Sequence, residues 1–397
     1  MARKKSPGRY AVMKKTEKRF GRMLLEGIGG LVASAISLGI LAVLLASLAL
    51  SSGSKPESVS ASASGMAIMD KFDMSMTNEI SKALDGIITI ERTYWLSDTE
   101  LVAPEAEYDH FGTAESPAEL AWLLEETAEL VGDQELIFNM DTPVWENDKI
   151  YYYYDETILA IAWKQKIDNC IFTMAEIKVA DGTQFRRFLA GGEFGSDKQF
   201  VTTEMAASVN AIVATSGDFY KFRQNGIVVY DGKVQRFEGK YIDTCFVDDK
   251  GDLILSYKKQ FSNKNEAQAF VDENKIRFSL VFGPILVDNY EAVMTTGYPL
   301  GEVFDEYTRA AVCQVGQKHY MFANVTTEPD YGFLRRMTIN QFAQVLADLG
   351  VQKAYALDGG QTTVICMQDQ LISYPDYGTQ RRISDIIYFA TAMQNGD

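Results

Sequence analysis

The longest uninterrupted hydrophobic stretch covers residues 27–50 and contains no charged side chain. Only small Ser and Gly residues interrupt its Leu, Ile, Val and Ala, so it lacks the polar stripe of an amphipathic helix in a soluble domain. As a helix, these 24 residues would span about 36 Å, enough to cross a hydrocarbon core of about 30 Å. We therefore predict one transmembrane helix over residues 27–50, in contact with the lipid bilayer.

The residues before this stretch form a basic tail. Residues 1–22 hold nine Lys and Arg residues and a single acid, Glu17. Because basic flanks stay in the cytoplasm, residues 1–26 are predicted to be cytoplasmic and the remainder extracytoplasmic, in a single-pass protein of the cell membrane. A cleavable signal peptide is the alternative, but its basic and apolar parts are usually shorter, which favours an uncleaved signal-anchor.

Residues 51–147 are predicted to be a linker and an accessory helical segment. A Ser-rich stretch follows the apolar run, and Ser116 with Glu119 forms the sequence of a capping box. An amphipathic, acidic helix through Leu120 and Leu130 is expected after it. Its role is left open between spacing, packing on the main domain and self-association.

From residue 148 the pattern changes to short apolar runs punctuated by Gly, Asp and Asn, such as residues 150–154, 170–179 and 278–287. Two helices interrupt them, one around residues 204–209 and one that starts at a Thr338–Gln341 capping box and stops at Gly350. We predict that residues 148–397 form one mixed α+β domain, β-rich and with few helices, preceded by the transmembrane helix and a partly helical stalk.

The charge and the cysteine content of the chain argue against two classes of function, nucleic-acid binding and metal binding. Beyond residue 22 the chain has 29 basic and 53 acidic residues, a net charge of −24, which would repel a nucleic-acid backbone. Four widely spaced cysteines show no CxxC or other metal-type spacing, so neither a zinc site nor any other metal or cofactor is expected. Disulfides remain open outside the cell, but each cysteine lies in a strand-like context typical of a small buried side chain.

The sharpest local feature is Asp358, which follows a short apolar strand and precedes Gly359 and Gly360. Glycines at such a position permit a tight bend and close backbone approach to a ligand, and consecutive N–H groups can bind an anion. Thr362 and Thr363 add hydroxyl donors. A plain turn between two strands is the alternative.

A second strand-end motif is Ser216-Gly217-Asp218, after the apolar residues 211–214. It again combines a small residue, a glycine and an acid. Asp218 is a candidate carboxylate for chemistry, and a residue that caps a turn is the alternative.

Several motifs in one order carry a family resemblance. They are Ser216-Gly217-Asp218-Phe219-Tyr220, Phe282-Gly283-Pro284-Ile285-Leu286-Val287, Thr308-Arg309-Ala310-Ala311, Leu357-Asp358-Gly359-Gly360 and Arg381-Arg382-Ile383-Ser384-Asp385. The set resembles the phosphodiester glycosidase family, whose members include the enzyme that uncovers mannose 6-phosphate and bacterial exopolysaccharide-related proteins. The resemblance covers residues 148–397. It departs from the family pattern at Gln361 and Thr362, where a third Gly and a Ser are usual, and at Ala310, where a Thr is usual.

The resemblance implies hydrolysis of a sugar-1-phosphodiester in envelope glycans or exopolysaccharide, with release of the sugar. Asp358 and Asp218 are then the candidate catalytic carboxylates, and Arg309 and Arg381 the candidate phosphate ligands, because guanidinium groups suit bidentate phosphate recognition. The expected substrate site is completed by Gly359, Gly360, Thr362, Thr363, Ser216 and Gly217. Each arginine could instead be a surface ion-pair partner.

Two other function classes stay open. A catalytically degenerate module that binds glycan or phosphodiester polymers of the envelope is favoured by Gln361 and Ala310, whereas the enzyme is favoured by Arg309, Asp358 and Arg381. A purely structural envelope protein has only the long stalk in its favour. The sugar, the stereochemical outcome and the oligomeric state are not specified by these patterns.

Overall fold

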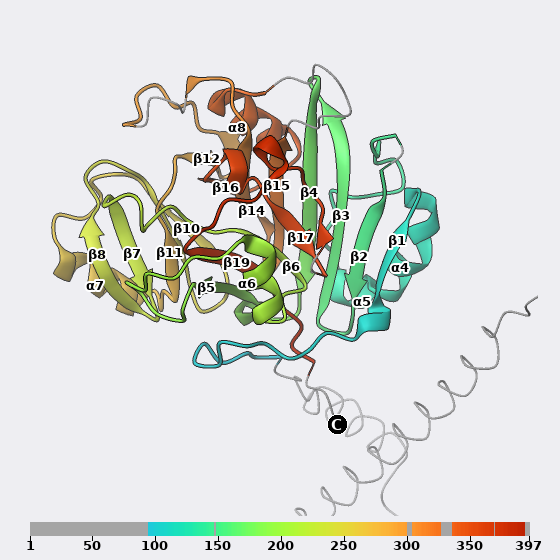
Figure 1. The fold of residues 1–397 in the computed structure, drawn as a ribbon, viewed down its shortest axis with the longest axis horizontal. Helices are drawn as coiled ribbons and strands as arrows, with labels where there is room; N and C mark the ends of the chain where they lie inside the picture. The colour runs from blue at the N-terminus through green and yellow to red at the C-terminus, as the bar shows by residue number, and fades with distance from the viewer. Residues whose placement is uncertain (1–93, 147, 300–303, 327–335, 369, 394–397) are drawn as a thin grey trace, which may run out of the picture. The chain divides into compact units, whose positions relative to one another are not determined.

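The computed structural model describes residues 94–393, except 147, 300–303, 327–335 and 369 (Figure 1). The predicted basic tail and transmembrane helix at residues 27–50 lie outside the described residues. Within the described part, no helix is both long enough and apolar enough to span a bilayer.

The described chain is β-rich with few helices, as predicted, and its strands form three antiparallel sheets. The largest has nine strands in the order β1-β2-β3-β4-β15-β14-β16-β12-β13. Their bounds are β1 Phe111–Ala114, β2 Ile150–Tyr154, β3 Ile158–Ile167, β4 Cys170–Val179, β12 Ile285–Asp288, β13 Glu291–Ala292, β14 Arg309–Gly316, β15 His319–Thr326 and β16 Lys353–Leu357.

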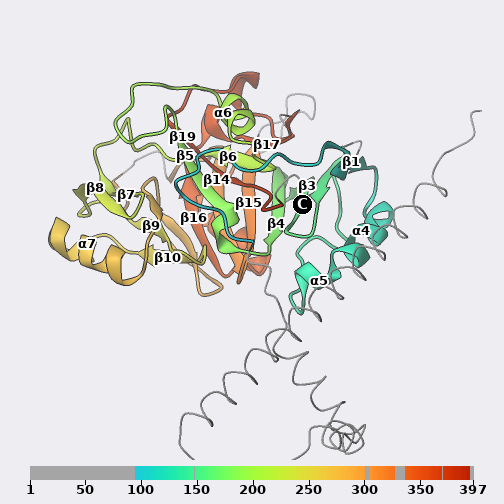
Figure 2. The same cartoon turned by 90° about the horizontal axis from the view of Figure 1, so that it is seen from below.

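Two five-stranded sheets accompany it (Figures 1 and 2). The second sheet has the order β10-β9-β11-β7-β8, with helix α7 (Lys264–Glu273) against β8, and the third has the order β18-β17-β6-β19-β5, with α6 (Thr202–Ser208) against β6 and β19. Their bounds are β5 Phe185–Leu189, β6 Val213–Ser216, β7 Gly226–Tyr230, β8 Lys233–Glu238, β9 Thr244–Val247, β10 Leu253–Ser256, β11 Phe278–Leu280, β17 Ile365–Met367, β18 Gln370–Leu371 and β19 Asp385–Phe389.

The central strands of the large sheet are covered on both faces, which explains their continuous apolar runs. Every residue of β4 is buried. On one face Phe172 of β4 contacts Phe342 of α8 (Ile339–Asp348), with ring centroids 6.0 Å apart. On the other face Phe322 of β15 contacts Phe389 of β19 at 5.4 Å, so the third sheet packs there.

Helix α8 begins and ends at the predicted residues. Thr338 and Gln341 form a reciprocal capping box, in which the Gln341 N–H donates to the Thr338 hydroxyl at 3.3 Å. Gly350 follows the helix with φ of +83°, a left-handed conformation that favours glycine.

The expected helix after Ser116 is not continuous. Its residues form a 3₁₀ turn (Pro117–Leu120), α4 (Ala121–Glu126) and α5 (Ala128–Val131), and the Ser116 hydroxyl bonds to Glu119 without capping a backbone N–H. Between the two helices the Thr127 hydroxyl donates to the Leu123 carbonyl at 2.8 Å. The Leu123 carbonyl thus accepts both the N–H and the hydroxyl of Thr127, an arrangement that weakens and bends a helix at this point.

The part of the accessory segment that the structure describes packs on the main domain. Residues 92–397 form one compact unit, in which β1 extends the nine-stranded sheet by pairing with β2. The Phe138 ring lies edge-on to the buried Trp163 ring at 5.2 Å. The sequence pattern predicts that residues 148–397 fold on their own, whereas these contacts favour a folding unit that includes the accessory segment.

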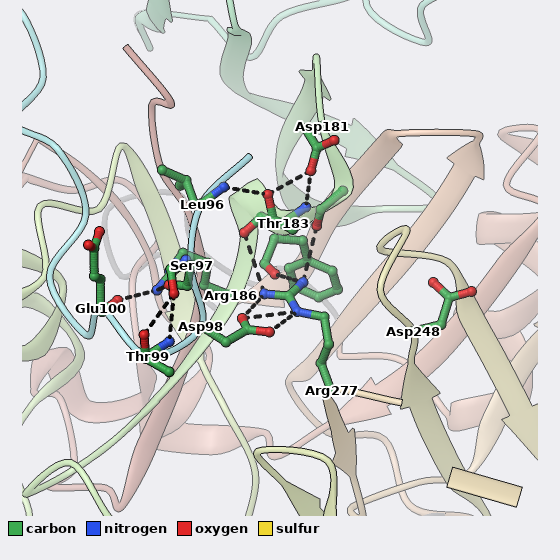
Figure 3. A network of polar contacts seen from close by, with 12 residues as sticks. Leu96, Ser97, Asp98, Thr99, Glu100, Asp181, Thr183, Arg186, Asp248 and Arg277 are labelled. Carbon is green, nitrogen blue, oxygen red and sulfur yellow. Dashed lines mark hydrogen bonds and ion pairs between the residues drawn. The ribbon is translucent and has the colours of Figure 1, made fainter. Parts of the chain in front are cut away.

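Two arginines hold the segment of residues 96–100, which contains a turn, on the domain (Figure 3). The Arg277 guanidinium forms an ion pair with the Asp98 carboxylate and donates to the Phe185 carbonyl at 2.9 Å. The Arg186 guanidinium donates to the Ser97 carbonyl at 3.1 Å. The segment that leads from the predicted linker into the domain is therefore held by charge-assisted hydrogen bonds.

Candidate active site

The glycine bend after β16 is pinned to the segment that enters β14. Gly360 has φ of +73°, and its N–H donates to the Thr308 hydroxyl at 2.8 Å. A Cβ atom on Gly359 would overlap the Thr308 carbonyl oxygen. Both glycines are therefore required by the local geometry, one for its backbone conformation and one for a close approach.

Asp358, the first residue after β16, forms an ion pair with Arg381. The Asp358 side chain is 16% exposed and that of Arg381 is 36% exposed, so the pair faces partly open space. Burial raises the pKa of the Asp358 carboxyl, and Arg381, the Thr362 hydroxyl and Arg223 oppose that rise. A carboxyl whose pKa is raised can hold a proton closer to neutral pH, as a catalytic acid must.

This pair opens into a cleft of about 730 Å³, and its lining includes the start of β14 and the end of β16. Arg309, Asp358, Gly359, Gly360 and Arg381 all line it, so tertiary structure gathers five of the predicted site residues. Its other lining residues are Phe219, Arg223, Phe282, Gly283, Tyr307, Thr308, Ala310, Ile339, Ala356, Leu357, Gln361, Asp376 and Tyr377.

Arg309 lines the cleft, but its guanidinium is engaged by backbone carbonyls. Its Nε donates to the Met337 carbonyl at 3.0 Å, and its Nη2 donates to the Asp305 carbonyl. Burial lowers the pKa of Arg309 to about 10. The side chain therefore ties the entry of β14 to the segment before α8, and less of its fork faces a ligand than the motif predicts.

Asp218 does not line the cleft, so the expectation that it shares one pocket with Asp358 is wrong. Its side chain is fully buried, and its carboxylate accepts hydrogen bonds from the Val281 N–H at 2.5 Å and the Phe219 N–H at 2.7 Å. Arg187 lies between Asp218 and Asp385, with N–O distances of 3.7 and 2.8 Å respectively. Burial raises the pKa of Asp218, and Arg187 opposes that rise.

The buried residues Arg187, Asp218 and Asp385 lie next to one wall of the cleft. The two N–H groups that Asp218 accepts belong to Phe219, a cleft residue, and to Val281, which precedes the cleft residue Phe282. Asp385 also accepts the Asp218 N–H at 3.0 Å. The acid of the second motif therefore holds the backbone beside two aromatic residues of the cleft and is not itself part of the lining.

The remaining predicted residues also hold the backbone. The Ser216 hydroxyl donates to the Thr362 carbonyl, and the hydroxyls of Thr362 and Thr363 donate to the carbonyls of Gly359 and Gly360. Gly217 leaves room for the Asp385 carboxylate, which an added Cβ would overlap. None of these four residues lines the cleft.

Two charged cleft residues were missed by the sequence analysis. The Arg223 guanidinium lies 4.4 Å from the centroid of the Phe282 ring and 5.2 Å from that of Phe219. Asp376 is a second carboxylate in the lining. Phe219 and Phe282 belong to recognised motifs, but Arg223 and Asp376 lie in loops without a local pattern that would mark them.

The departures from the family pattern affect the cleft unequally. Ala310 is buried in β14 and pairs with Leu357. The Gln361 side chain lines the cleft, and its amide donates to the Thr379 hydroxyl at 2.9 Å. Both residues line the cleft, and Gln361 is the one that adds a polar side chain to its surface.

The fold and the cleft define a β-rich domain with an acid–arginine site. Residues 209–390 match the family model described as phosphodiester glycosidase. The resemblance is therefore confirmed, and this part of the chain carries the sequence pattern of the phosphodiester glycosidase family. No curated protein sequence matches the chain.

The solved structures similar to this chain include the following three. The catalytic domain of zebrafish N-acetylglucosamine-1-phosphodiester alpha-N-acetylglucosaminidase, auto-inhibited by its pro-peptide, has 18% identity and a TM-score of 0.48 over 66% of this chain and 92% of that one. A hypothetical protein from Synechocystis has 16% identity and a TM-score of 0.43 over 63% and 64%. A putative exported protein from Burkholderia pseudomallei has 11% identity and a TM-score of 0.37 over 58% and 74%.

Proposed function

We propose that this protein is a hydrolase that cleaves the glycosyl bond of sugar-1-phosphodiesters. The observation that carries the proposal is the Asp358–Arg381 ion pair in a cleft also lined by Arg223. Two guanidinium groups beside one carboxylate provide an anion site next to an acid–base group. The family match over residues 209–390 supports the same reaction class.

We place the phosphodiester group of the substrate at Arg223 and Arg381. The Phe219 ring lies 5.2 Å from the Arg223 guanidinium and 5.0 Å from that of Arg381, so one aromatic ring supports both cations. Stacking on an aromatic face leaves the edge of a guanidinium available for a bidentate bond to phosphate. Arg309 contributes less, because backbone carbonyls occupy its fork.

Binding and proton transfer are coupled through Arg381. A phosphate that recruits Arg381 removes the cation that opposes the raised pKa of Asp358. Asp358 then takes up a proton and can donate it to the glycosidic oxygen as the bond to the anomeric carbon breaks. Phosphate is a good leaving group, so this proton assists departure without being indispensable.

The test is release of sugar from a synthetic sugar-1-phosphodiester by the full chain in detergent. Asp358→Asn should lower kcat by about 10²-fold, the lower end of the usual contribution of a positioned acid or base, because phosphate is a good leaving group. Arg381→Lys should mainly raise KM, because lysine lacks the planar fork. Arg382→Lys is the matched control, since Arg382 is exposed and outside the cleft lining. Wild-type protein that binds the substrate but releases no sugar would refute the hydrolase.

We further propose that the domain acts outside the cell, held by a signal-anchor at residues 27–50, on envelope glycans or exopolysaccharide. The uncharged run and its basic N-terminal flank support this topology. Protease added to intact cells should remove the domain, and full protection of residues 65–397 would contradict it.

The second candidate is a binding module without turnover, favoured by the Gln361 amide in the cleft lining. Gln361→Gly separates the two candidates. In an enzyme the variant keeps or raises turnover, because the usual small residue is restored. In a binding module it changes affinity for the polymer while sugar release stays absent.

A further inference from the structure

Asp376 shares the cleft with Asp358 although the two lie in different loops. It begins the 3₁₀ turn Asp376–Gly378, and its side chain is 5% exposed. Its Oδ2 accepts a hydrogen bond from the Thr308 hydroxyl at 3.3 Å and lies 3.5 Å from Arg336 Nη2. It is therefore a carboxylate in a fixed position at the edge of the cleft.

Thr308 connects this carboxylate to the glycine bend. The fully buried Thr308 hydroxyl accepts the Gly360 N–H at 2.8 Å and donates to Asp376. The spacing between Asp376 and the loop that carries Asp358 is thus set by two consecutive hydrogen bonds. Tyr307 lies beside the same bend, and burial together with Asp376 raises its pKa, with a smaller contribution from Asp358.

Hydrolysis needs a group that accepts a proton from water, and the cleft restricts the choice. Among the residues that the structure describes, Asp358 and Asp376 are the carboxylates in its lining. Asp358 is paired with Arg381, on the side where we place the phosphate, and Asp218 is buried behind the wall. Two carboxylates with different partners can divide acid and base roles.

We propose that Asp376 is the catalytic base that activates water in the reaction put forward above, on which this inference rests. Water oxygen bonds to the anomeric carbon while its proton passes to the Asp376 carboxylate. The bond from the anomeric carbon to the phosphate oxygen breaks, and its electron pair leaves with the phosphomonoester. The products are the free sugar and the phosphomonoester, and Asp376 returns its proton to solvent.

The experiment measures sugar release by the full chain in detergent for wild type, Asp376→Asn, Asp376→Ala and the control Asp305→Asn. Asp305 has an exposed side chain near the cleft but outside its lining. Asp376→Asn should lower kcat by about 100-fold or more with little change in KM, because the base acts only in the transition state. The control should keep wild-type kcat.

Rescue by azide tests whether Asp376 acts as a base or only stabilises the 3₁₀ turn. Azide attacks the anomeric carbon without losing a proton, so added sodium azide should restore the rate of Asp376→Ala and yield a glycosyl azide. Azide should not restore Asp358→Asn. A folded Asp376→Ala protein that azide does not rescue, or an Asp376→Asn variant within threefold of wild-type kcat, would overturn the proposal.

Sugar release by the wild-type protein separates the hydrolase activity from the role of Asp376 as its base. If wild type releases no sugar, the hydrolase itself fails and the base assignment fails with it. If wild type is active and Asp376→Asn is equally active, only the assignment of Asp376 fails.

Discussion

Replacing Arg187 by Met should strongly destabilise the domain. Arg187 is 1% exposed at its side chain, and it is the cation placed between the fully buried carboxylates of Asp218 and Asp385. Methionine fills a comparable volume without charge, so the substitution removes the compensating cation and leaves little cavity. The effect therefore measures the cost of two unpaired buried carboxylates.

Loss of one partner from a buried ion pair typically costs about 3–5 kcal/mol, and we expect a value in this range at pH 7.5. Backbone bonds limit the loss, because Asp218 keeps the N–H groups of Phe219 and Val281. Protonation of the Asp218 and Asp385 carboxyls limits the loss of stability further. Burial already raises the pKa of both carboxyls, and without Arg187 these pKa values rise more.

The sign of the pH dependence follows from this rise. The folded variant binds more protons than its unfolded chain between the ordinary carboxyl pKa, about 4, and the raised values. Its stability must therefore increase as the pH falls from 7.5 to 5. The difference in the free energy of unfolding between the variant and wild type should shrink by up to about 1.4 kcal/mol per pH unit for each carboxyl that takes up a proton.

Urea unfolding followed by circular dichroism at pH 7.5 and pH 5 provides the measurement. The control Arg382→Met, at an exposed arginine outside this buried cluster, should change stability by less than about 0.5 kcal/mol. The double variant Arg187→Met/Asp385→Asn should recover part of the loss because one of the two charges is gone. A loss below about 1 kcal/mol, or one independent of pH, would refute the assignment of Arg187 as the compensating cation.

Three further predictions concern the cleft and the domain boundary. Asp358→Asn should raise Tm at neutral pH, since ionising a carboxyl of raised pKa opposes folding, and the gain should vanish below the ordinary carboxyl pKa; a gain that persists in acid would contradict this. Gly359→Ala should lower the midpoint of urea unfolding and abolish sugar release, because the new Cβ meets the Thr308 carbonyl oxygen, whereas Gly297→Ala, with no atom nearby and no left-handed backbone, should retain activity. Residues 148–397 expressed alone should aggregate while residues 92–397 remain soluble, because β1 covers β2 and Phe138 covers Trp163; equal solubility would show that the accessory segment is dispensable.

The features that the sequence determined by itself are local ones. The Thr338–Gln341 cap depends on residues three apart, and Gly350 stops the helix because a left-handed conformation is easiest for glycine. The same reasoning applies to the bend at Gly360. Continuous apolar runs predicted a β-rich domain, and the ordered set of motifs predicted the family that residues 209–390 match.

The direction in which each charged side chain points was decided by tertiary structure. Asp218 and Asp358 both follow a strand and adjoin glycine, and local pattern does not distinguish them. Pairing of β19 with β5 brings Arg187 to Asp385, 198 residues away, and the cation holds Asp218 in the interior. Arg223 and Asp376 reach the cleft from loops whose positions depend on contacts far away in the chain. A buried charge requires a partner, and long-range pairing alone determines which partner is present.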